Sequence, residues 1–169
     1  MAERPSEPTN KSLLSPIGFS FNIQKLPHVN YFCTQATIPD VTLGVVELHN
    51  PFVKTPKAGD KLEFADLSLQ FKVDEDMKNY QEIFNWMQGL GYPDNFDQRA
   101  NLIAGSHIYS DASLLITTNQ YKPNIDITFI DLHPTSLSAV EFNIEQGDVD
   151  YLNADVSFAY RRYKLTTVS

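Results

Sequence analysis

The feature that most constrains the fold is an alternating apolar run that passes into an amphipathic helix without a Gly or Pro break. The run spans residues 62–73, and its apolar members are Leu62, Phe64, Leu67, Leu69, Phe71 and Val73. Alternation with a period of two predicts a half-buried strand. The phase is kept only if Ala65-Asp66 adds one residue, which indicates a β-bulge or a strong bend. Together these patterns favour a mainly β protein that packs one helix.

The helix begins after an acidic junction, Asp74-Glu75-Asp76, whose carboxylates suit a helix N-terminus because they accept from free N–H groups and favour the dipole. Four apolar residues then follow with the spacing i, i+3, i+4 and i+7: Tyr80, Ile83, Phe84 and Met87. This spacing predicts one apolar stripe that packs onto a sheet. Gly89 and Gly91 are expected to end the helix.

Strand patterns flank this central segment on both sides. They cover residues 17–24, 31–38, 42–49, 112–118, 124–131, 139–145 and 153–163. Residues 26–30 and 132–135 contain turn-forming residues and are predicted as turns between strands. The order of elements predicts two packed antiparallel sheets, as a β-sandwich or barrel, with one flanking α-helix.

The segment between the strand at 42–49 and the long apolar run is predicted to be an extended, exposed connection. Its sequence combines prolines, a glycine and charges of both signs, and its length favours a functional role. The alternative is a solvated hairpin tip. The candidate contact residues are His49, Asn50, Pro51, Phe52, Val53, Lys54, Thr55, Pro56, Lys57, Ala58, Gly59 and Asp60.

Composition limits the classes of function. A formal net charge of −8 disfavours general nucleic-acid binding, which needs Lys and Arg to neutralise phosphates. The single cysteine, Cys33, excludes an intramolecular disulfide and is expected to be a small buried residue in a strand. No apolar run is long enough for a signal peptide core or a transmembrane helix. Residues 1–15 are predicted to form a flexible N-terminal arm, and residues 16–169 a single domain.

No catalytic or metal-binding constellation is visible. The acidic junction is explained better by its position at a helix start than by catalysis. The four histidines are scattered singly, without the spacing of metal ligands. Arg161-Arg162 is the main basic cluster, but neighbouring strand residues point to opposite faces, so one arginine is expected to pair with an acidic neighbouring subunit and the other with solvent. We therefore expect no enzyme activity and no cofactor.

Three sequence blocks, in this order, resemble the tail tube family of contractile-tailed bacteriophages. The first is FCTQATIP at residues 32–39, which leads from a strand into a proline stop. The second is the strand, acidic junction and Trp-bearing helix at residues 58–87. The third is residues 127–163, which contain a strand, the His133-Pro134 turn, an acidic turn and a long closing strand. The resemblance spans residues 17–166, and the N-terminal arm departs from it.

The resemblance implies a structural virion protein whose hexameric rings stack into the tail tube, the conduit for DNA ejection. Sheets of neighbouring subunits would join into an inner barrel around the lumen, and segment 49–60 would reach the next ring. The implied partners are further copies of the chain and the tail sheath, tape-measure and baseplate proteins, with no membrane. DNA would pass through the lumen without specific binding. The implied location is the virion tail, after assembly in the host cytoplasm.

Three other interpretations stay open. A baseplate-proximal tube initiator or hub ring would share the fold. A monomeric carbohydrate-binding β-sandwich is disfavoured because Trp86 lies in the helical segment rather than in a row of exposed aromatic residues. A hydrolase on a β scaffold is disfavoured by the missing catalytic arrangement.

Overall fold

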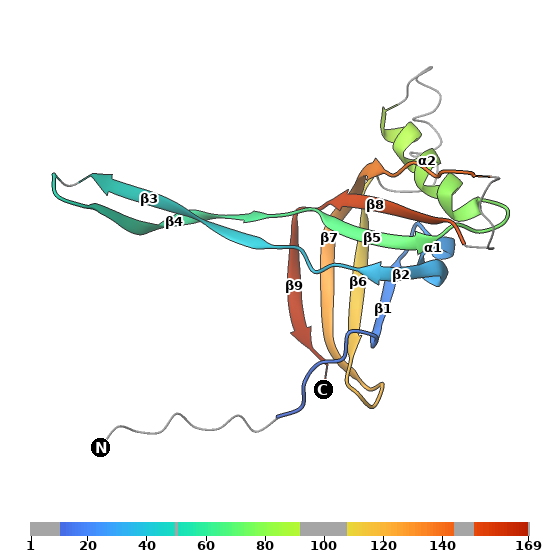
Figure 1. The fold of residues 1–169 in the computed structure, drawn as a ribbon, viewed down its shortest axis with the longest axis horizontal. Coiled ribbons are helices and arrows are strands. Elements are labelled where there is room, and N and C mark those ends of the chain that lie inside the picture. The colour runs from blue at the N-terminus through green and yellow to red at the C-terminus, as the bar shows by residue number, and fades with distance from the viewer. Residues whose placement is uncertain (1–10, 50, 92–107, 144–150, 169) are drawn as a thin grey trace.

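The computed structural model describes residues 11–49, 51–91, 108–143 and 151–168 (Figure 1). In chain order the elements are β1 (Phe19–Ile23), α1 (Pro27–Phe32), β2 (Cys33–Ala36), β3 (Val41–His49), β4 (Lys54–Phe64), β5 (Leu67–Lys72), α2 (Lys78–Gly91), β6 (Ser110–Thr117), β7 (Pro123–Leu137), β8 (Asn153–Ala159) and β9 (Arg162–Thr167). The fold is mainly β, and every strand pair is antiparallel. The predicted fold class is confirmed.

One seven-stranded sheet forms the body of the molecule. Its strand order is β1-β6-β7-β8-β5-β2, and β9 adds to β7. Strand β7 belongs to both halves of this sheet: residues 125–130 pair with β9, and residues 133–137 pair with β8. Figure 1 shows that β1, β6, β7 and β9 run at a steep angle to β5 and β8, so the two halves pack face to face.

The core lies between the two halves and is closed at one end by the helices. Its largest fully buried side chains include Phe71, Phe129 and Phe158, one each from β5, β7 and β8. These strands alternate buried and more exposed residues, as a half-buried sheet requires. Helix α2 adds Ile83 and Trp86 to the same cluster, and the indole Nε1 of Trp86 donates to the carbonyl of Ile108 at 3.1 Å.

The buried face of α2 is rotated from the predicted stripe. Ile83 is buried as predicted, but Phe84 is 52% exposed, so its predicted place on the packed face is wrong. Trp86 replaces it, because the larger indole lies at i+3 from Ile83 and fills the centre of the interface. Gly89 is buried inside the helix rather than ending it, and the helix extends to Gly91.

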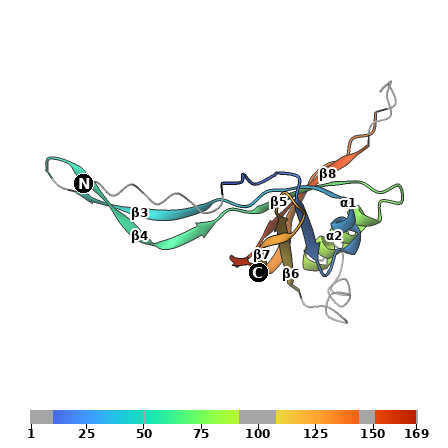
Figure 2. The ribbon, with the colours of Figure 1, turned by 90° about the horizontal axis from the view of Figure 1, so that it is seen from below.

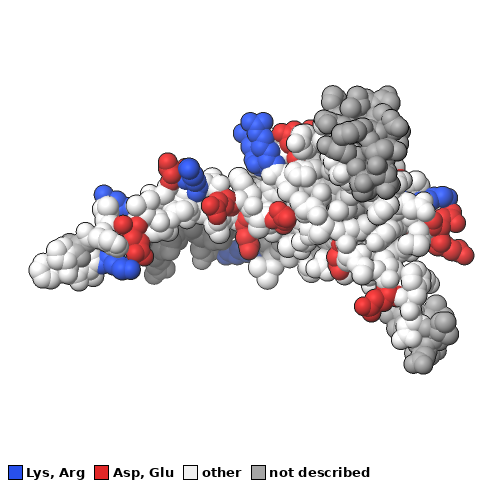
Figure 3. Space-filling view, turned by 90° about the horizontal axis from the view of Figure 1, so that it is seen from above, with Lys and Arg blue, Asp and Glu red and all other residues white. Residues whose placement is uncertain are grey.

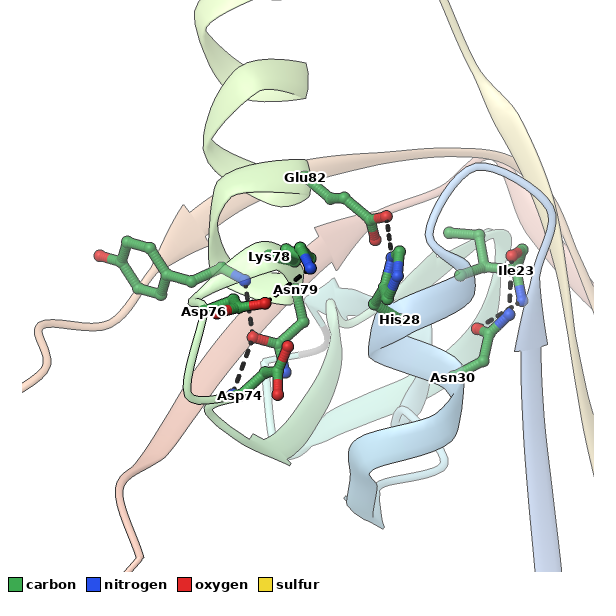
Figure 4. Close-up of polar contacts among 9 residues, drawn as sticks. Ile23, His28, Asn30, Asp74, Asp76, Lys78, Asn79 and Glu82 are labelled. Carbon is green, nitrogen blue, oxygen red and sulfur yellow. Dashed lines mark hydrogen bonds and ion pairs between the residues drawn. The ribbon is translucent and has the colours of Figure 1, made fainter.

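The acidic junction lies in the turn before α2, not in its first helical turn (Figure 4). The buried Asn79 joins the end of β5 to the helix start. Its Oδ1 accepts from the backbone N–H groups of Asp74 and Tyr80 at 3.3 and 2.8 Å, and its Nδ2 donates to the carbonyl of Lys72 at 2.7 Å. Among the described residues, the Asp74 carboxylate accepts only from the next backbone N–H, of Glu75, at 3.0 Å. The Asn79 amide joins strand to helix because it can both accept and donate, which a carboxylate cannot.

Both predicted turns are regular structure instead. Residues 26–30 lie mostly in α1, which begins at Pro27 because proline suits the first helical position. Residues 132–135 lie inside β7, where the strand passes from one half of the sheet to the other. The strand tolerates Pro134 because this part of β7 pairs on one side only, with β8.

The C-terminal strand predictions need two corrections. The single strand predicted over 153–163 is two strands, β8 and β9, which separate at Tyr160-Arg161 and pair with different parts of β7. The strand predicted over 139–145 is absent from residues 139–143, and residues 144 and 145 lie outside the described residues. Residues 1–10 of the predicted N-terminal arm also lie outside them.

Candidate assembly surface

A two-stranded hairpin projects from the body, and its faces are not covered by any other described element. It is formed by β3 and β4, which pair only with each other. We call residues 41–64, without Asn50, the projecting hairpin. Figures 1 and 2 show it extending far beyond the body in two views at right angles. An isolated two-stranded ribbon is only marginally stable in water, and no other described element of the chain pairs with this one.

The projecting hairpin is the outer part of one longer hairpin. Its inner part is β2 paired with β5, and backbone hydrogen bonds from Thr37 to Ser68 and from Ala65 to Asp40, both 3.0 Å, continue the pairing across the junction. In the body, β5 has β8 as its second neighbour, but β8 ends before the junction. The outer edges of β3 and β4 are therefore unpaired within the described chain. Open edges of this length are templates for pairing with another chain.

The structure places the predicted contact residues at the end of this hairpin. His49 ends β3, residues 51–53 form the connection, and Asn50 lies outside the described residues. Residues 54–60 are not part of a loop, as predicted, but belong to β4. The prolines, the glycine and the charges that suggested a loop are tolerated because an exposed edge strand needs few donors and no buried side chains.

Exposed apolar side chains cover both faces of the projecting hairpin. Val45 and Val46 are neighbours in β3 and point to opposite faces, yet they are 64% and 55% exposed. Phe52, in the connection, is 95% exposed. The other exposed apolar side chains of the hairpin are Val41, Leu43, Leu48, Val53 and Leu62. Exposed apolar side chains that gather on one element make the hairpin the candidate interaction surface of the described chain.

The projecting hairpin carries no net charge. Its charged residues are Glu47, Lys54, Lys57, Asp60, Lys61 and Glu63. Figure 3 shows the two signs interspersed along it, and Lys54 pairs with Glu47 at 3.2 Å. The formal charge of −8 therefore lies on the rest of the chain. A neutral hairpin can approach an acidic copy of the same protein without net repulsion.

A glycine pair marks a bulge halfway along the hairpin. Between the pairs Leu43↔Leu62 and Val45↔Ala58, residues 59–61 of β4 oppose Gly44 alone. A Cβ atom added to Gly59 would lie 2.7 Å from the carbonyl carbon of Gly44 and closer still to its oxygen. Only glycine fits this close approach of two backbones, which bends and twists the ribbon.

An aromatic cluster holds the root of the hairpin. Phe64, the last residue of β4, packs against Tyr163 and Tyr160 with ring centroids 5.5 and 6.2 Å apart. Both tyrosines pack in turn on the buried Phe129, with ring centroids 5.1 Å away for Tyr160 and 5.8 Å away for Tyr163. Burial, with the nearby Tyr163 and Asp66, raises the pKa of Tyr160 to about 12. The root is therefore fixed to the core, although the hairpin itself is exposed.

The other candidate groups show local structural contacts rather than a reactive site. Asp76 pairs with Lys78 at 2.6 Å, which lowers the pKa of that carboxyl, and His28 contacts Glu82 between α1 and α2 (Figure 4). Arg161 lies 3.7 Å from Asp131 of the same chain. The expected pairing of one of the two arginines with a neighbouring subunit stays a prediction. Cys33 is half-buried, and burial raises the pKa of its thiol to about 11, which disfavours the reactive thiolate.

Two classes of site have no support in the described part of the chain. It contains no group of three or more His, Cys, Asp or Glu side chains placed to hold a metal ion. None of its helices has the length and apolar character needed to cross a membrane.

Sequence reasoning found the hairpin tip but missed most of its interaction surface. Val45, Val46 and Leu48 were recognised only as strand residues. The available signal was the adjacent pair Val45-Val46. A strand with one covered face alternates apolar and polar residues, so two adjacent apolar residues indicate apolar side chains on both faces. The residues at the root, Phe64, Tyr160 and Tyr163, come from distant segments, and only the fold brings them together.

Comparison with known proteins identifies relatives for nearly the whole chain. The family model described as phage tail tube protein matches residues 6–166. The chain is similar in structure to the tube-terminating cap of an anti-feeding prophage, with a TM-score of 0.67, 15% identity and coverage of 99% of this chain and 100% of that chain. None of the curated proteins matches it.

Two further solved structures come from an extracellular contractile injection system, PVC, in its extended state. The similarity to a chain of its sheath–tube complex has a TM-score of 0.62 and 13% identity, and covers 94% of each chain. The similarity to a chain of its sheath/tube terminator has a TM-score of 0.60 and 15% identity, and covers 98% of this chain and 99% of that chain. At these identities the likeness shows the fold.

Proposed function

This chain belongs to the phage tail tube protein family, and on that premise we propose that it is a subunit of hexameric rings that stack into a hollow tube. The observation that carries the proposal is the projecting hairpin, with unpaired strand edges and apolar side chains exposed on both faces. A second copy of the chain supplies the cover that these surfaces lack. Residues 49–60, at the end of the hairpin, contact the next ring.

The tube serves as a conduit for DNA during ejection from a virion tail, and its subunits assemble in the host cytoplasm. The net charge of −8 supports this role, because acidic walls repel phosphates and prevent binding during passage. Sheath and baseplate proteins are the proposed neighbours of the tube, in line with the sheath–tube and baseplate assemblies that contain similar chains. A tape-measure protein is proposed to occupy the lumen before DNA. The role is structural and needs no cofactor.

A second candidate is a ring at one end of the tube, such as a baseplate-proximal initiator. It is favoured by the similarity to a tube-terminating cap. The two candidates differ in one property, because a tube subunit stacks indefinitely and an end-ring protein stops after one ring.

Electron microscopy of the purified chain at increasing concentration tests the proposal. Tubes are the expected result, single rings favour the end-ring candidate, and strictly monomeric protein at high concentration contradicts both. The matched variant is Val46→Asp/Leu48→Asp, which places charges on one exposed face of the hairpin. It is expected to keep the melting temperature of the subunit and to form no tubes. The control is Gln81→Asp/Asn85→Asp, which adds the same two charges on the exposed side of α2 and should leave assembly unchanged.

A further inference from the structure

The projecting hairpin is attached to the body through two short connections, and each connection is held by one tyrosine hydroxyl. The Tyr160 hydroxyl donates to the carbonyl of Ala65, just after β4, at 2.8 Å. The Tyr163 hydroxyl donates to the carbonyl of Pro39, just before β3, at 3.5 Å. The two connections are also joined to each other, because the backbone N–H of Ala65 donates to the backbone carbonyl of Asp40. All of these contacts lie at the root of the hairpin.

We propose that Tyr160 and Tyr163 are positioning residues that fix the angle between the projecting hairpin and the body. We call this pair the tyrosine clamp. The proposal rests on the proposed contact between the hairpin and another copy of the chain, for which that angle decides whether the hairpin meets its partner.

The rings and the hydroxyls have separate roles in the clamp. The rings pack between Phe64 of the hairpin and Phe129 of the core, which gives the contact its area. Ring packing alone permits sliding, because stacked and edge-on arrangements of aromatic pairs have similar energies. The hydrogen bonds add direction, since they weaken steeply when the donor angle changes. The hydroxyls therefore set the angle and the rings hold the contact together.

The length of the hairpin makes a small angular error large at its tip. Strand β3 has nine residues, and at about 3.3 Å per residue it extends about 30 Å. A swing of about 10° at the root then moves the tip by about 5 Å, which matches the spacing between neighbouring strands. An error of this size places the hairpin one strand away from its binding position. The root is thus the place where one hydrogen bond controls assembly.

A third contact supports the same connection without replacing the clamp. The hydroxyl of Thr135 lies 3.3 Å from the carboxylate of Asp66 and 3.1 Å from the carbonyl of Ser157. It restrains the chain one residue beyond Ala65, on the β5 side. It does not restrain the connection before β3, which is held by the hydrogen bond from Tyr163 to Pro39.

The test measures the hairpin angle in the unassembled subunit and then assembly. Spin labels are attached at Val53→Cys, at the end of the hairpin, and at Ser20→Cys, on the exposed face of β1, in a Cys33→Ala background. The distance distribution between the labels is compared with and without the substitutions Tyr160→Phe and Tyr163→Phe. Tyr31→Phe, which removes a hydroxyl from a side chain that is 84% exposed, is the control.

Each lost hydroxyl is expected to raise the population of displaced hairpins by about 2- to 12-fold, the equilibrium effect of one hydrogen bond. The distribution should broaden, and more for Tyr160→Phe because its bond is the shorter. The concentration needed for assembly should rise in the same order, while the melting temperature of the subunit stays close to that of the parent. A merely structural role would lower the melting temperature without broadening the distribution.

An unchanged distribution in the double variant overturns the clamp, whether or not tubes form. If the variants broaden the distribution but the parent chain itself never assembles, the clamp is supported and the proposed tube function is contradicted, so the two failures are separable. If the double variant does not fold, Tyr160→Phe alone provides the same comparison, because it removes one hydroxyl and keeps both rings.

Discussion

The bulge in the projecting hairpin gives the sharpest prediction, the substitution Gly59→Ala. The added Cβ would meet only backbone atoms of Gly44, at 2.7 Å from its carbonyl carbon and 3.2 Å from its Cα. Side chains can rotate away from a clash, but these backbone atoms cannot. The carbonyl carbon alone requires the two strands to separate by roughly 0.7 Å to reach the 3.4 Å of an ordinary contact, and the carbonyl oxygen, which lies closer still, requires more.

Overpacking of this kind costs about 1–3 kcal/mol. Because the hairpin contacts the body core through Phe64 at its root and not at the bulge, that cost falls on the hairpin alone. The free energy of unfolding of the body, measured by urea denaturation, should change by less than about 0.5 kcal/mol, as for substitutions away from packed sites. Amide protons of β3 and β4 should exchange faster, and tubes should fail to form at the concentrations at which the parent chain assembles.

The matched control is Gly44→Ala, on the opposite strand of the same bulge. A Cβ there would have its nearest neighbour, the carbonyl oxygen of Lys61, at an ordinary 3.8 Å. Both substitutions remove a glycine, so a difference between them isolates the clash. Assembly of the Gly59→Ala chain at the parent concentration, with protected hairpin amides, would refute the reasoning.

Three further predictions test the core, the root and the tip. Ile83→Ala should lower the free energy of unfolding by about 2–5 kcal/mol because Ile83 is fully buried, whereas Phe84→Ala should cost less than about 1 kcal/mol; equal costs in urea denaturation would contradict the observed face of α2. Burial raises the pKa of Tyr160 from 10.0 to about 12, so ionisation of its hydroxyl is disfavoured in the folded subunit and folding stability falls as the pH rises from 10 to 12. The free energy of unfolding of the parent, which is close to that of Tyr160→Phe at neutral pH, should therefore fall below that of the variant over this range, and a constant difference would argue against it. Deletion of residues 51–57 should leave a folded subunit that does not elongate, and unchanged tube growth on electron micrographs would exclude a contact role for this segment.

Local periodicity predicted most of the strands and the long helix correctly. At residues 67–71 and along α2, each element has one buried face. The spacing of apolar residues, two in a strand and 3.6 in a helix, is enough to identify such a face. The break at Ala65-Asp66 was also predicted, although it proves to be the junction between the body and the projecting hairpin rather than a bulge in one strand.

Two of the errors lie where one strand serves two parts of the sheet. Residues 132–135 contain a proline, but β7 continues through them because β8 pairs with only one of its edges. Tyr160-Arg161 interrupts an unbroken alternating pattern because β8 and β9 join different halves. The sequence of a strand reports which residues are covered but not which strand covers them. The proposed interaction surface is partly hidden for the same reason, since the proposed cover would come from another copy of the chain.

The continuity of β2 with β3, and of β4 with β5, has a mechanical consequence. Tension applied to the hairpin tip travels along covalent backbone into β5, and from there to β8 through the ladder between residues 67–72 and 153–158. The load runs parallel to these strands, so the ladder is sheared as a whole instead of being unzipped bond by bond. Because many hydrogen bonds must then break together, the subunit resists tension along its strands better than tension applied across them.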